Sequence, residues 1–310
     1  MRLLAIAALS LPATLVACAA DGPTVATEQQ AIIGGSAAPD DGAVVLLASY
    51  PPNRSVLATC TAVLIAPTVV VTAAHCVDAT NHPGYLYGVF PGADASIYPR
   101  LVDLEPHLLP VTTVHAHPSY NPAAPFHADL GVAILAAPLA GVAPIKLWRD
   151  PVDTLVGGPA RIVGYGQQVV GTPASTRRQA ATIVAGVDAD DTVRVGDVSH
   201  LTCLGDSGGP ALVDRGGVEV LLGIDSYADN ASCDRPAHFR RADLYQAFLD
   251  SYTGDHPPLV DAGVTGPDAG DAPSKDDGGC TTSGGAAPWP LALAVGLLGL
   301  GLRRRRVRPS

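Results

Sequence analysis

The sequence predicts an all-β domain. Glycine and proline are abundant, at 33 and 28 of 310 residues, while aromatic residues make up only 5% of the chain. Such a composition suits many short strands joined by turns better than it suits a helical bundle. Short runs rich in Val, Leu and Ile recur, and Gly, Pro, Asn or Asp stand between most of them. The length is enough for one large all-β domain or two small ones.

The clearest predicted strands are five apolar runs: Val44–Ala48, Ala62–Ala66, Val69–Thr72, Arg161–Tyr165 and Val218–Asp225. The best helix candidate is Ala242–Tyr252, which reads ADLYQAFLDSY. Helical spacing would put Leu244, Ala247 and Phe248 on one apolar face. We therefore expect the folded domain to span residues 32–253.

Residues 1–20 are predicted to be a signal peptide. They contain one Arg, an apolar run and an exit of small residues, with cleavage expected after Ala19 or Ala20. The string LVAC, ending at Cys18, also resembles a bacterial lipobox, in which the cysteine is acylated after cleavage. Both readings export the chain to the cell surface, the outer membrane or the medium, so its cysteines can pair.

The C-terminal region changes composition after Thr253. Residues 254–279 are rich in Asp, Gly and Pro, without apolar periodicity, and are predicted to be a disordered linker. In residues 280–310, Cys280 precedes an apolar stretch, 286–302, whose length of 17 residues is at the short limit for crossing a bilayer. An arginine cluster follows, and this order resembles the sorting tails of myxobacterial surface proteins. That resemblance implies attachment through Cys280, whereas the alternative is a plain membrane anchor; both predict contact with the cell envelope.

The net charge of the chain indicates which classes of partner it can bind. The net charge is −10, and residues 32–253 carry 21 acidic and 12 basic side chains. An acidic body argues against nucleic acid as a partner. His115 and His117 flank Ala116, but no acidic or Cys partner lies at a convincing ligand spacing, so we predict no metal and no cofactor.

Three strings contain residues typical of acyl transfer: VVVTAAHC with His75, HADLGVAIL with Asp129, and CLGDSGGP with Ser207. Taken singly, each has a structural explanation, such as a buried histidine, a turn-capping aspartate or a tight Gly-rich turn. Together they supply a nucleophile, a base and a carboxylate that orients the base. Glycines beside the serine let backbone N–H groups converge on an oxyanion, and we predict Gly205 and Ser207 as its donors.

These strings resemble the trypsin-like (chymotrypsin-fold) serine endopeptidases. TAAHC and GDSGGP match the two strongest signatures of the family, DLGVAIL fits a third, and RIVGYG (Arg161–Gly166) resembles its Gly-aromatic-Gly turn. The resemblance covers about 32–253 and implies two six-stranded antiparallel β-barrels with a C-terminal α-helix. It implies a serine endopeptidase acting on protein or peptide substrates in the cleft between the barrels, and we expect a monomer. The alternative function is an inert surface homologue that binds without cleaving.

The resemblance also assigns supporting residues. Four cysteines of the domain allow three pairings by spacing alone; the family implies Cys60–Cys76 and Cys203–Cys233. Ser226 matches the serine that supports the catalytic aspartate.

The string IIGG matches the family's activation terminus. Residues 21–31 would then be a propeptide, and the new ammonium of Ile32 would pair with the carboxylate of Asp206. The residue before the cut is Ala31, not Lys or Arg.

The specificity pocket has two possible readings. The family places its floor six residues before the nucleophile, at Leu201, and wall residues at Ala228 and Ala237, which implies an elastase-like preference for small or medium aliphatic residues. Such an enzyme could cut after Ala31 and activate itself. Asp225 favours the other reading, because a carboxylate pointing into the pocket would accept a basic side chain.

Overall fold

The structure is a computed structural model that describes residues 32–123, 126–166, 175–230 and 232–254. All of these residues belong to one unit, Met1–Asp261. The predicted signal peptide and propeptide, the anchor segment and all of the linker except Gly254 lie outside the described residues. Within those ranges, no helix has the length and apolar character needed to cross a membrane.

The first barrel is built from strands that are close in sequence. Its closed order is β2-β3-β4-β7-β6-β5, and every pairing is antiparallel. The strands are β2 (Val44–Tyr50), β3 (Ala58–Ala66), β4 (Val69–Thr72), β5 (Leu86–Phe90), β6 (Leu109–Ala116) and β7 (Gly131–Leu135). Its helical turns are η1 (Ala74–Cys76), α1 (Leu101–Leu104) and η2 (Glu105–His107).

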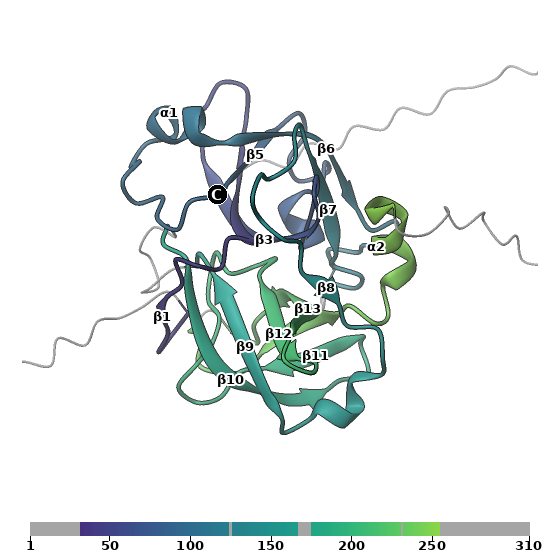
Figure 1. Cartoon of the computed structure of the whole chain (residues 1–310). Coiled ribbons are helices and arrows are strands. Elements are labelled where there is room, and N and C mark those ends of the chain that lie inside the picture. Colours follow the sequence, from purple (N-terminus) through teal and green to yellow (C-terminus); the bar gives the residue numbers. More distant parts are fainter. Residues whose placement is uncertain (1–31, 124–125, 167–174, 231, 255–310) are drawn as a thin grey trace, which may run out of the picture. The chain divides into compact units, whose positions relative to one another are not determined.

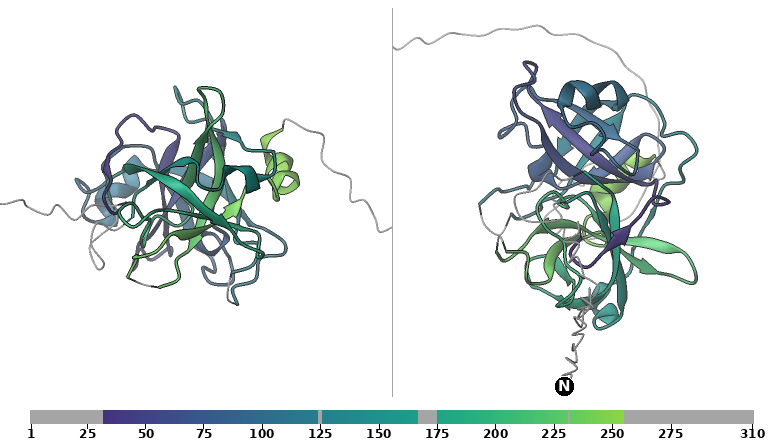
Figure 2. Two further views of the ribbon diagram at one scale, coloured as in Figure 1. Left: turned by 90° about the horizontal axis from the view of Figure 1, so that it is seen from below. Right: turned by 90° about the vertical axis from the view of Figure 1, so that its left-hand side faces the viewer.

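The second barrel follows in sequence and closes through the pairing of β9 with β10. Its strands are β9 (Pro159–Gly164), β10 (Arg178–Val187), β11 (Thr192–Val195), β12 (Pro210–Asp214), β13 (Glu219–Tyr227) and β14 (Ala237–Arg241). Two short strands add to it, β1 (Ser36–Ala37) on β10 and β8 (Lys146–Leu147) on β13, and η3 (Val152–Leu155) precedes β9. Figures 1 and 2 show the blue strands of the first barrel and the green strands of the second as two groups. The two six-stranded antiparallel barrels confirm the predicted fold class.

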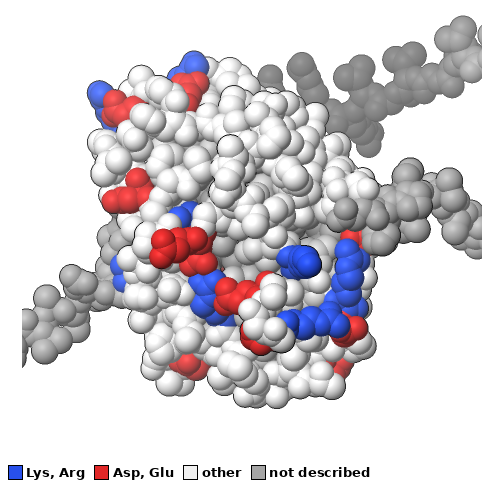
Figure 3. Space-filling model, viewed as in Figure 1, with Lys and Arg blue, Asp and Glu red and all other residues white. Residues whose placement is uncertain are grey.

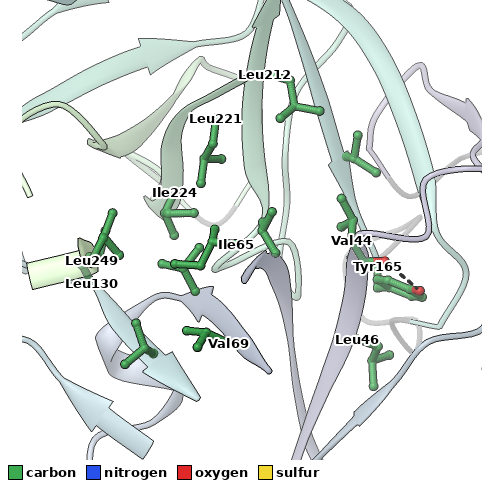
Figure 4. Close-up of a cluster of buried hydrophobic side chains, with 14 of the residues drawn as sticks. Val44, Leu46, Ile65, Val69, Leu130, Tyr165, Leu212, Leu221, Ile224 and Leu249 are labelled. Atoms are coloured by element: carbon green, nitrogen blue, oxygen red, sulfur yellow. Dashed lines mark hydrogen bonds between the residues drawn. The ribbon is translucent and has the colours of Figure 1, made fainter. Parts of the chain in front are cut away.

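Burial on both faces explains why several strands are continuous apolar runs. Every residue of β2 is buried. Val44 and Leu46 pack in a core shared with second-barrel residues such as Leu212, whereas Val45 packs in a separate cluster of first-barrel residues. Figure 4 shows the shared core, in which side chains from both barrels meet. The shared core holds the barrels together, because its residues leave water only when the barrels pack against each other.

The predicted strands are all present, and their ends differ from the predicted bounds by at most four residues. Several strands were not predicted, among them the largely buried β7, β12 and β14. In β6 (LPVTTVHA), intermediate and exposed residues are mixed and no residue is fully buried, so it has no continuous apolar run.

The predicted helix begins later than expected, and its buried face is different. It is α2, Gln246–Thr253, and Leu244 and Ala247 are exposed. The buried side chains are Tyr245 and Leu249, with Phe248 partly buried. Residues before Gln246 form a turn instead, because the Ala242 amide donates to the Leu222 carbonyl (2.9 Å) and continues the contact with β13.

Charged side chains are dispersed on the face shown in Figure 3, where acidic and basic groups mostly lie next to one another. Arg161 illustrates the pattern, because its guanidinium binds both Asp41 (2.8 Å) and Glu219 (2.5 Å).

Candidate active site

His75 and Asp129 are brought together by the pairing of β4 with β7. β4 ends at Thr72, opposite Gly131 at the start of β7, so the residues just beyond these ends are neighbours. The carboxylate of Asp129 accepts from the backbone amide of His75 (2.8 Å) and lies 2.8 Å from its ring Nδ1. Asp129 is completely buried, while the His75 side chain is 28% exposed. A carboxylate at Nδ1 holds the proton there, so Nε2 faces outward with a free lone pair.

Ser226 completes the hydrogen bonding of Asp129. It lies in β13 of the second barrel, and its hydroxyl donates to Asp129 Oδ2 at 2.6 Å. The two barrels therefore meet at this carboxylate.

Ser207 lies on a tight turn between Cys203 and β12. Gly205 and Gly208 have positive φ values of 94° and 84°, a backbone conformation that favours glycine. The Ser207 carbonyl accepts from the amide of Thr61 in the first barrel (2.8 Å), which ties this turn to the barrel that carries His75. A Cβ on Gly208 would lie 2.1 Å from the Thr72 hydroxyl, so only glycine permits this approach.

Two backbone N–H groups in the Ser207 turn are available to bind a substrate oxygen. Within the described residues, the amides of Gly205 and Ser207 donate no hydrogen bond. The Ser207 hydroxyl makes no hydrogen bond to His75 in the same ranges, a common situation before substrate binds. The site therefore presents a hydroxyl, an oriented imidazole and two free N–H groups, the set of groups that acyl transfer requires.

Two disulfides brace the site with the predicted pairing. Cys60–Cys76 joins β3 to the residue after His75, and Cys203–Cys233 joins the Ser207 turn to the segment after β13. In the described part of the chain, the only cluster with metal-binding potential is Cys60, His75 and Cys76, and its two sulfurs are bonded to each other.

Asp206 is completely buried beside Ser207. Its carboxylate accepts from the amides of Gly166 (2.7 Å) and Cys203 (2.9 Å), and burial raises its pKa to about 7. A Cβ on Gly164 or Gly166 would lie 2.0 or 2.3 Å from this carboxylate. The Gly-aromatic-Gly turn is therefore what leaves room for the Asp206 side chain.

Ile32 is completely buried against the second barrel. The next residue, Ile33, pairs with Leu201, its amide donating to the Leu201 carbonyl at 2.9 Å. Ile32 has a φ of +46°, which is strained for a β-branched residue.

A pocket of about 270 Å³ opens beside Ser207. Of the predicted pocket residues, Asp225, Ser226 and Ala228 line it. Leu201 and Ala237 are buried, with 2% and 1% exposure, and are not among its lining residues. The remaining lining residues are Thr202, Cys203, Leu204, Ser207, Tyr227, Asn230 and Cys233.

Sequence reasoning missed Thr202 and the aromatic side chains near the site. The Phe126 ring lies 6.1 Å from the ring of His75 and 6.1 Å from that of Tyr227. Tyr227 was discoverable, because it directly follows Ser226, which the family resemblance had singled out, whereas Phe126 lies in a loop that carries no local signal.

Comparison with known proteins gives a consistent result. A family model described as Trypsin matches residues 32–249. "Trypsin" of Saccharopolyspora erythraea is 30% identical over 196 residues, 57% of this chain and 78% of that protein. "Ovochymase" of Halocynthia roretzi is 25% identical over 196 residues, and "Serine protease 56" of Homo sapiens is 27% identical over 212. These alignments cover 57% and 61% of this chain but only 12% and 34% of the two relatives. The fold, the positions of His75, Asp129 and Ser207, and a family match over more than half of the sequence lead to one conclusion: the chain belongs to the trypsin family of serine proteases.

Proposed function

We propose that this chain is an exported serine endopeptidase that hydrolyses peptide bonds through an acyl-enzyme on Ser207. The observation that carries the proposal is the bonded set His75–Asp129–Ser226 next to the Ser207 turn. Export is supported by the two disulfides, which persist in oxidising compartments.

The reaction follows from the positions of these groups. Ser207 Oγ attacks the peptide carbonyl while His75 Nε2 takes its proton, and Asp129 stabilises the imidazolium that forms. The amides of Gly205 and Ser207 hold the oxyanion. His75 then gives the proton to the leaving amine, and water, activated in the same way, releases the acyl group from Ser207.

A fluorophosphonate label tests this proposal on the purified full chain. We expect the label on Ser207, located by mass spectrometry, and no label on the Ser207→Ala variant. Ser199→Ala changes an exposed serine and is the matched control, with labelling unchanged. A folded wild-type protein that takes no label would instead support the inert surface homologue.

We propose that cleavage between Ala31 and Ile32 activates the chain. Ile32 is buried and strained, and the carboxylate of Asp206 is held by two amides, without a cation in the described residues. A new ammonium at Ile32 would compensate the buried charge of Asp206, because an unpaired buried carboxylate is costly. N-terminal sequencing of the active protein should begin at Ile32; an active protein that begins elsewhere would contradict this step.

Attachment to the cell envelope through Cys18 or Cys280 is a further part of the proposal. It is supported by the lipobox-like string, the apolar segment 286–302 and the arginines that follow. Mass spectrometry of both mature termini should find a lipid-sized mass on one of these cysteines. Unmodified cysteines in protein isolated from membranes would count against it.

Residue preference at the bond to be cut depends on the pocket. The aliphatic reading relied on Leu201, Ala228 and Ala237, and only Ala228 lines the pocket. The basic reading relied on Asp225, which lines it.

A further inference from the structure

The Asp225 side chain lies in the pocket because of strand alternation and two backbone hydrogen bonds. In β13, Ile224 packs in the shared core, so its neighbour Asp225 faces the opposite side, where the pocket is. The Asp225 carbonyl accepts from the amide of Gly208 (2.8 Å), and its amide donates to the Gly209 carbonyl (2.8 Å). These bonds fix Asp225 directly across from the Ser207 turn.

The carboxyl of Asp225 has polar partners but no cation. The Thr202 hydroxyl and the Ser226 amide are its hydrogen-bonding neighbours, and Thr202 also lines the pocket. Within the described residues, no Arg or Lys forms an ion pair with Asp225. Only 5% of the residue is exposed, so water compensates little of its charge.

The other titratable groups near Asp225 carry or share negative charge. Asp206 lies in the Ser207 turn and Asp129 just before β7, and both are completely buried. His75 Nδ1 lies 2.8 Å from Asp129 Oδ2, the same oxygen that accepts from the hydroxyl of Ser226. Burial, and then the charges of Asp206 and Asp129, raise the pKa of Asp225 well above its usual range. Among the described residues, no neighbouring Arg or Lys therefore compensates a charge on Asp225.

We propose that Asp225 is the counter-ion for a Lys or Arg side chain of the substrate, at the residue whose carbonyl Ser207 attacks. The proposal rests on the function proposed above for Ser207. A cation in the pocket would pair with a carboxyl that otherwise lacks one, while Thr202 holds the carboxyl in place. The acidic group of the pocket is then Asp225 of strand β13. It does not come from the predicted floor position, since Leu201 pairs with Ile33 and is not a lining residue.

This assignment has two consequences. Since a cation prefers the ionised carboxyl and burial raises the pKa of Asp225, turnover of basic substrates should increase with pH more than turnover of neutral ones. A pocket that binds Lys or Arg does not suit cleavage after Ala31. The argument for self-activation, which required a pocket for small aliphatic residues, then fails, and a different protease must cut between Ala31 and Ile32.

Matched peptide amides that differ only in the residue before the scissile bond test the proposal on the purified, processed protein. We expect kcat/KM for Arg or Lys to exceed that for Ala, Val and Gln by at least about 30-fold, the effect of one charge-assisted contact. In Asp225→Asn this preference should disappear, while fluorophosphonate labelling of Ser207 continues. Asp229→Asn removes a charge next to the pocket residue Asn230 and should keep the preference.

The possible outcomes distinguish a failure of the role proposed for Asp225 from a failure of the proposed endopeptidase function. Wild-type protein that labels at Ser207 but cleaves the Ala, Val or Gln peptides faster than the Arg peptide overturns the role of Asp225 and leaves the endopeptidase intact. Protein that neither labels nor cleaves overturns both. Calorimetry with benzamidine, a cationic probe, should show binding to the wild-type protein that is much weaker in Asp225→Asn; equal affinities of the two proteins would also refute the proposal.

Discussion

Arg177, just before β10, is predicted to be one of the largest single contributors to stability in this domain. Only 2% of the residue is exposed, and it forms no ion pair with a carboxylate in the described residues. Its guanidinium instead donates to the carbonyls of Ala38 (2.7 Å), Pro39 (2.7 Å) and Val44 (2.8 Å). These bonds tie the N-terminal segment and the start of β2 to the second barrel.

The expected loss in the free energy of unfolding follows from the backbone carbonyls that Arg177→Met deprives of a donor. Each short bond from a charged donor contributes about 1.5–3 kcal/mol, but burying the guanidinium costs several kcal/mol in return. Methionine fills much of the volume and removes the guanidinium donor from the carbonyls of Ala38 and Pro39, while, in the described residues, the Val44 carbonyl keeps only a long bond from the Tyr165 hydroxyl (3.4 Å). We therefore expect the free energy of unfolding to fall by about 3–5 kcal/mol, a large share of the roughly 5–15 kcal/mol typical of domains.

Guanidinium chloride unfolding at pH 7 measures this loss, in a Ser207→Ala background that prevents self-digestion. The midpoint should fall while the slope of the transition stays constant. Arg100→Met is the control, because Arg100 forms an exposed pair with Asp103 and its loss should have no measurable effect. A loss below about 1 kcal/mol for Arg177→Met would refute the reasoning, since water or other donors would then satisfy the carbonyls.

Three further predictions concern groups around Ser207. Because burial raises the pKa of Asp206 from 3.8 to about 7, the folded precursor holds this proton at pH values where the unfolded chain has lost it. Thermal midpoints of the uncleaved chain should therefore fall as pH rises across that window, and Asp206→Asn should flatten the fall; equal slopes would contradict this. Gly208→Ala, with a Cβ clash at 2.1 Å, should lower the thermal midpoint far more than Gly216→Ala, which has a similar φ and open space; equal shifts would refute the clash. Ser226→Ala removes the 2.6 Å bond to Asp129 and should lower kcat about 10-fold with KM little changed, measured by steady-state kinetics; an unchanged kcat would exclude this role.

A local apolar run was sufficient to predict β4, although the largely buried strands β7, β12 and β14 were not predicted. Residues 69–72 are apolar throughout because both faces of β4 are covered, and the predicted bounds of this strand are the observed ones. The helix was placed too early because an apolar pattern cannot report that Ala242 still bonds to β13. The glycines of RIVGYG matched a motif, but the reason for them, the space taken by Asp206, depends on a residue distant in sequence.

By itself the sequence determined the fold class, the strings that carry His75, Asp129 and Ser207, and, through the family resemblance, both disulfide pairings. The motifs and the strand pattern consist of residues adjacent in sequence, and the disulfide pairings follow from the pattern shared by the family. The tertiary structure alone decided which side chains reach the pocket. Leu201 is paired with Ile33, while Asp225 is held against the Ser207 turn and faces the cavity. The direction of each side chain depends on strand register and on pairing between segments far apart in sequence, which no local pattern encodes.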